Sequence, residues 1–84
     1  MSNDYIIEKL HENNLMYFYL GGLINSNNLS SISDCERSLR DLNRLKESLP
    51  KAKIENECKA KYTKFIEDGF EEVNKYLRIF QNKN

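Results

Sequence analysis

The sequence has few of the residues that break helices or cross-link small domains. Its 84 residues include one proline and three glycines, so long helices are favoured. Two cysteines and one histidine, without a close-spaced pair of the C-x-x-C type, do not give the ligand spacing of a zinc motif. An all-α protein is therefore predicted, with no metal and no cofactor.

No apolar run is long enough to cross a membrane. The longest, residues 15–24, has ten residues, all apolar or glycine, about half of the ~20 that a span requires. The N-terminus is acidic, and the polar residues 25–28 follow the run, so a secretory signal pattern is missing. A cytoplasmic protein is expected.

The chain also lacks an excess of charge of either sign. Residues 1–36 hold one basic residue against five acidic ones, a sum of −4. Residues 37–64 hold nine against four, a sum of +5, and residues 65–84 hold three against four, a sum of −1. A globally basic nucleic-acid binder is not supported. Instead, the acidic first part is expected to lie beside the basic middle.

One domain spanning residues 1–84 is predicted, because the chain shows no linker and no internal repeat. Helices are expected at about 4–24, 33–49 and 51–81, with a loop at 25–32. These elements predict a three-helix up-down-up bundle with a long C-terminal helix. A core this small supplies little net stability, so dimerisation is expected as a supplement.

Local signals define the helix ends. Ser33 and Glu36 have the spacing of a capping box at the start of the second helix. Pro50 disfavours helical geometry in the residue before it and ends that helix. Gly69 lies inside the apolar stripe of the third helix, where a bend or a close crossing is expected.

The first helix is apolar on two sides. Tyr17-Phe18-Tyr19 has strand propensity, but no second alternating strand follows Gly22, which favours a helix. On a helical projection one side carries Ile6, Ile7, Leu10, Tyr17, Phe18 and Ile24, with Gly21 open to a close approach. The opposite side carries Tyr5, Met16, Tyr19 and Leu23. A second apolar side predicts contact with another copy or another protein.

Polar candidates are few. Arg37, Arg40 and Arg44 share the outer side of the second helix and could bind carboxylates or phosphates. Cys35 and Cys58 lie on apolar faces, too far apart for a disulfide, and are interpreted as reduced core thiols. The single histidine, His11, has no recognisable catalytic partner and is interpreted as a side chain at the edge of the core.

Residues 69–83, Gly-Phe-Glu-Glu-Val-Asn-Lys-Tyr-Leu-Arg-Ile-Phe-Gln-Asn-Lys, resemble the C-terminal end of the AsiA family of anti-sigma factors from T-even phages. The resemblance implies a small all-helical protein that dimerises through its N-terminal helix. It also implies binding to the C-terminal region of a primary sigma factor. Residues 1–60 show no alignable similarity, so no functional residue is carried over.

The leading hypothesis is a non-enzymatic regulator or inhibitor, phage or mobile-element encoded, that masks the surface of a protein target. Its expected apolar contacts are Tyr5, Met16, Tyr19 and Leu23, and its expected polar contacts are Arg37, Arg40 and Arg44. An alternative is an obligate homodimeric structural or chaperone-like assembly component. A lesser alternative is a nucleic-acid-binding regulator that uses the three arginines.

Overall fold

The fold is all-helical. A computed structural model describes residues 3–82, in which no strand occurs. The α-helices are α1 (Asn3–Glu12), α2 (Met16–Ile24), α3 (Ile32–Ser48) and α4 (Asn56–Gln81), with short 3-10 turns η1 (Ser26–Asn28) and η2 (Leu49–Lys51). The predicted all-α class is confirmed, but this part of the chain has four helices where three were expected.

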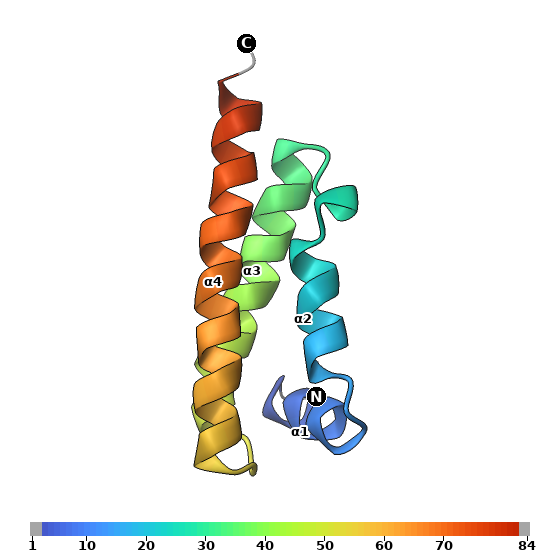
Figure 1. The fold of residues 1–84 in the computed structure, drawn as a ribbon, viewed down its shortest axis with the longest axis vertical. Coiled ribbons are helices and arrows are strands. Elements are labelled where there is room, and N and C mark those ends of the chain that lie inside the picture. The colour runs from blue at the N-terminus through green and yellow to red at the C-terminus, as the bar shows by residue number, and fades with distance from the viewer. Residues whose placement is uncertain (1–2, 83–84) are drawn as a thin grey trace.

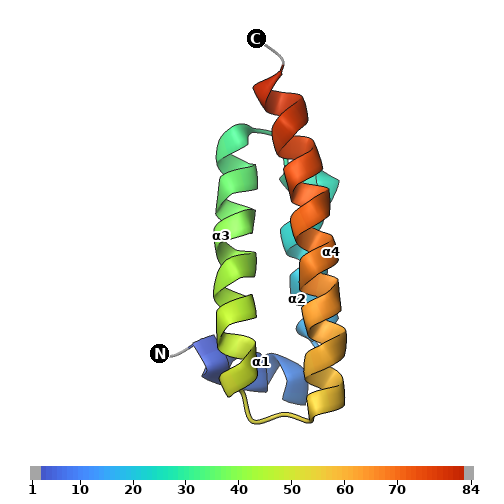
Figure 2. The same ribbon diagram turned by 90° about the vertical axis from the view of Figure 1, so that its left-hand side faces the viewer.

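Three of the helices lie side by side along a molecule that measures 45 × 23 × 19 Å. In Figure 1, α2 runs upward, α3 returns downward and α4 runs upward again, past the N-terminal end of α3. Figure 2 shows α1 lying across the lower end of the bundle, level with the last turns of α3 and the first turns of α4. None of the described helices is both long and apolar enough to cross a membrane.

The core is formed by apolar residues from all four helices and their connections. Leu42, Ile66 and Val73 are fully buried, as the periodicity of the last two helices predicts. The acidic α1 packs against α3 and η2, as the charge distribution predicts. The buried apolar residues are Ile7, Met16, Leu20, Leu29, Cys35, Leu42, Leu45, Leu49, Ala52, Tyr62, Ile66 and Val73.

The predicted helix over residues 4–24 is wrong, because the chain turns at residues 13–15. Asn14 adopts the left-handed conformation, with φ 58°. Its N–H donates to His11 O at 3.1 Å, and the N–H of Leu15 donates to Leu10 O at 2.8 Å. This pair of bonds is the Schellman motif, which ends helices most often at glycine and sometimes at asparagine.

The turn changes which residues of the first segment are buried. Ile7 is buried from α1, while Met16 and Leu20 are buried from α2, so the two helices present different faces to the core. Phe18, expected on the inner side, is 82% exposed instead. The prediction of one helix with two apolar sides was wrong because residues 4–24 form two helices with different axes.

Two further helix boundaries differ from the prediction. The N-cap of α3 is Ser31, whose Oγ accepts from the N–H of Asp34, so Ser33 and Glu36 do not form the capping box. The third predicted helix begins at Asn56 and not near residue 51. Before it, the N–H of Lys53 donates to the Glu8 carboxylate at 2.8 Å. This bond connects the segment before α4 to α1.

At Gly69 the helices pack closely. A Cβ at this position would lie 3.0 Å from Cγ2 of Ile24 and 3.5 Å from Cδ1 of Leu42. The expected close crossing is therefore confirmed. Gly21 is different, because nothing lies within 4 Å of an added Cβ. The expectation of a close helix approach at Gly21 is not met within the chain.

Asn14 provides a test of the turn. Because φ is positive, Asn14→Ala should destabilise the protein by about 1–2 kcal/mol, while Asn14→Gly should be near neutral. Urea unfolding followed by circular dichroism measures both values. Asn13→Ala is the matched control, and equal losses for the alanine and glycine variants of Asn14 would contradict the turn.

Gly69 provides a test of the crossing. Gly69→Leu should destabilise the protein by about 1–3 kcal/mol, because the added atoms meet Ile24 and Leu42. The same change at Gly21 should be neutral or stabilising, because helix propensity improves and nothing is displaced. The measurement is the free energy of unfolding of both variants, and a tolerated Gly69→Leu would refute the close crossing.

Candidate functional site

The outward side of α2 exposes large apolar side chains. Leu15, Phe18, Tyr19 and Gly22 have helical spacing that places them together on this side, and we call them the α2 face. Leu15 is 46% exposed and Phe18 is 82% exposed. The segment Met16–Ile24 contains no charged residue. Large side chains exposed in this way mark interaction surfaces when they are contiguous.

The four predicted apolar contact residues differ in exposure. Tyr5 and Tyr19 are exposed, the latter at 38%. Leu23 is partly buried against the core. Met16 is 1% exposed and belongs to the core, so its prediction as a contact residue is corrected. A charged residue at Met16 would disturb folding and would not report on association.

Arg37, Arg40 and Arg44 are exposed on α3, as predicted. Arg44 Nη1 lies 3.6 Å from the Asp41 carboxylate. Burial raises the pKa of the Tyr19 phenol, the Asp41 carboxylate raises it further and Arg44 lowers it. Tyr19 is therefore within electrostatic range of this ion pair, and it connects the α2 face to the charged surface of α3.

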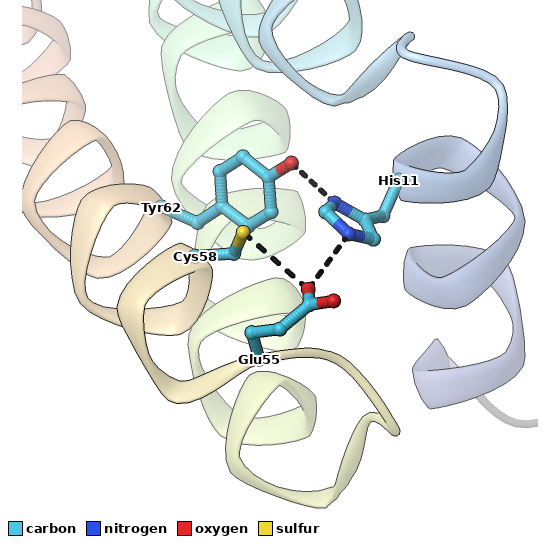
Figure 3. A network of polar contacts seen from close by, with 4 residues as sticks. All are labelled: His11, Glu55, Cys58 and Tyr62. Carbon is cyan, nitrogen blue, oxygen red and sulfur yellow. Dashed lines mark hydrogen bonds and ion pairs between the residues drawn. The ribbon is translucent and has the colours of Figure 1, made fainter.

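A second candidate site lies at the lower end of the molecule, where α1 meets the start of α4. Figure 3 shows His11, Glu55, Cys58 and Tyr62 converging there, and we call these residues the polar network. His11 Nδ1 lies 2.7 Å from the Tyr62 hydroxyl. His11 Nε2 lies 3.4 Å from Glu55 Oε2. The Cys58 thiol donates to the same oxygen at 3.6 Å.

The turn at Asn14 and the start of α4 position the polar network. The turn ends α1 just after His11, so the imidazole faces α4. Glu55 is the N-cap of α4, but its side chain makes no capping hydrogen bond and is directed at His11 and Cys58. In the described residues no buried side-chain polar atom lacks a partner.

The protonation of the network follows from its contacts. A hydrogen bond from its own backbone lowers the pKa of Glu55, and bonds to Cys58 and His11 lower it further, so Glu55 is ionised at neutral pH. Desolvation raises the pKa of the Cys58 thiol, and the neighbouring Glu55 carboxylate adds to this effect. Desolvation also raises the pKa of Tyr62. Thiol and phenol are therefore protonated at neutral pH.

His11, Glu55 and Cys58 form a possible ligand set that the sequence analysis missed. Their ligand atoms all lie within 4.8 Å of one another. His11 lies 44 positions before Glu55, so no sequence motif connects them. The spacing Glu55-x-x-Cys58 places two ligand types on neighbouring turns of a helix, and it is the only local signal. His11 is half-buried, as predicted, and both cysteines are free thiols.

Comparison of the chain with protein families, with curated proteins and with solved structures finds no match. Function is therefore argued from the two sites alone. No pocket is found among the described residues.

The bond between Tyr62 and His11 can be tested by deletion of one hydroxyl. Tyr62→Phe should destabilise the protein by about 0.5–1.5 kcal/mol, the net value of one hydrogen bond. Tyr17→Phe is the matched control, because the Tyr17 ring packs edge-on against Tyr62 and Phe65. A double-mutant cycle with His11→Ala should show that the free energy lost in Tyr62→Phe comes from the bond to His11. A coupling energy of zero between the two positions would contradict the bond.

Proposed function

We propose that this protein is a non-enzymatic regulator or inhibitor that masks the surface of a protein target. The observation that carries the proposal is the α2 face, an uncharged helix side with Phe18 almost wholly exposed. Six of the eight large exposed apolar residues in the described chain lie in α1, in α2 or between them: Tyr5, Ile6, Leu15, Tyr17, Phe18 and Tyr19.

The α2 face has the properties of an interface centre. Aromatic side chains dominate binding energy in such centres, and charged residues are depleted there. Burial of Leu15, Phe18 and Tyr19 is worth on the order of 3–6 kcal/mol before the costs of association. Gly22 adds no side chain to this face, which allows the backbone of a partner to approach closely.

Charged side chains border the α2 face on one side. Tyr19 is within electrostatic range of Asp41 and Arg44, and Arg40 and Arg37 continue the charged surface along α3. An apolar centre with a polar rim is the usual composition of a protein interface. The partner that fits is a protein with an apolar groove edged by acidic residues, which the arginines would bind as carboxylate ligands.

A second copy of the chain is the alternative occupant, which would make the protein a homodimeric assembly component. The lack of charge in Met16–Ile24 favours this alternative, because two α2 helices can meet without like-charge repulsion. The nucleic-acid alternative has weaker support. One of its three arginines, Arg44, is already paired with Asp41.

The test combines Leu15→Ser with Phe18→Asp. Both positions are exposed, so the variant should keep the helical spectrum and the unfolding free energy of the wild type. Light scattering first measures whether the wild type is monomeric or dimeric. A photo-reactive phenylalanine analogue at position 18 then captures what contacts this face in the source cell.

The control position is Ile79, which is 43% exposed at the far end of α4. Light scattering of Ile79→Asp and photo-crosslinking from position 79 repeat the two measurements there. The proposal expects a monomer and one protein adduct that forms from position 18, not from 79, and that competes with unlabelled wild type. A dimer abolished by the double variant would establish the homodimer instead. A monomer without an adduct specific to position 18 would refute both.

A further inference from the structure

We propose that His11, Glu55 and Cys58 bind one Zn²⁺ ion per chain, which joins α1 to the first turn of α4. This site is independent of the α2 face. It would have three protein ligands and an open fourth position, which water or a partner's side chain could fill. In the structure the three donor groups are connected through a single atom, Glu55 Oε2.

The distances between the donors suit a tetrahedral ion. Zinc bonds of about 2.0–2.3 Å to nitrogen, oxygen and sulfur, at tetrahedral angles, place the donor atoms about 3.3–3.6 Å apart. His11 Nε2 and Glu55 Oε2 are separated by 3.4 Å, and Cys58 Sγ and Glu55 Oε2 by 3.6 Å. The remaining pair, His11 Nε2 and Cys58 Sγ, lies within 4.8 Å and would come closer on binding.

The chemistry of the donors selects the metal. A thiolate and an imidazole favour zinc over magnesium or calcium, which take oxygen ligands. Binding would replace the thiol proton of Cys58, which is released to the buffer, by the Zn–S bond.

Tyr62 supplies the support that zinc-bound histidines usually have. Metal-ligating imidazoles hydrogen-bond through the other ring nitrogen, which fixes the tautomer and the orientation of the ring. In this structure Nε2 faces Glu55, and Nδ1 lies 2.7 Å from the hydroxyl of Tyr62, which is buried. In the zinc complex Nδ1–H would donate to the Tyr62 oxygen.

The experiment uses tag-free protein in a phosphine reductant, titrated with Co²⁺ and then with Zn²⁺. Tetrahedral Co²⁺ with a thiolate ligand gives intense visible bands and a near-ultraviolet charge-transfer band. We expect both bands with one equivalent of cobalt and their loss on addition of zinc. Zinc should also raise the thermal midpoint of the wild type.

Two variants test the ligands, and a third tests the support of His11 by Tyr62. Cys58→Ser and His11→Gln should each lower the zinc affinity by more than about 100-fold, beyond the usual loss for a supporting residue. Tyr62→Phe should lower the affinity about tenfold and retain the charge-transfer band. Cys35→Ala is the matched control, because Cys35 is the other thiol of the chain and lies outside the cluster.

The outcome is decisive even if the Cys58 variant does not fold. The sequence holds two cysteines, so a charge-transfer band that persists in Cys35→Ala must come from Cys58. A wild-type cobalt complex without this band would overturn the proposal. Zinc affinities of folded Cys58→Ser and His11→Gln within about twofold of the wild type would overturn it as well.

Discussion

The left-handed conformation of Asn14 is the constraint on which the two candidate sites depend. This conformation is sterically unfavourable for an L-residue, and it is less unfavourable for asparagine than for most others. The two backbone bonds at the end of α1 satisfy carbonyls that the helix leaves open. Because α1 ends there, it lies across the lower end of the bundle and α2 begins a new direction along α3 and α4.

The change of direction produces both surfaces. It directs His11 from α1 toward Glu55 and Tyr62, which a straight helix over residues 4–24 would not do. It also rotates α2 so that Met16 and Leu20 enter the core while Phe18 faces outward. The polar network and the α2 face therefore arise from one backbone turn, although they lie on different parts of the molecule.

The bundle itself is held by ordinary apolar packing, which includes a close crossing at Gly69. There the last residue of α2 and the middle of α3 both contact α4. The ion pairs in the described chain contribute less to the fold. Four of the five join residues three or four positions apart on one helix. At least one partner of each pair is exposed, and such pairs have a small net value. The fifth joins His11 to Glu55, is an ion pair only when the imidazole is protonated, and belongs to the polar network.

The sequence by itself determined the helical class, the apolar faces of α3 and α4 and the exposed arginines, because helix periodicity is a local property that amino-acid spacing records. The tertiary structure decided the turn at Asn14, the burial of Met16, the exposure of Phe18 and the meeting of His11 with Cys58. An Asn-Asn pair allows a left-handed stop but does not require one. Contacts between residues 47 positions apart depend on how the helices pack, which no spacing in the sequence encodes.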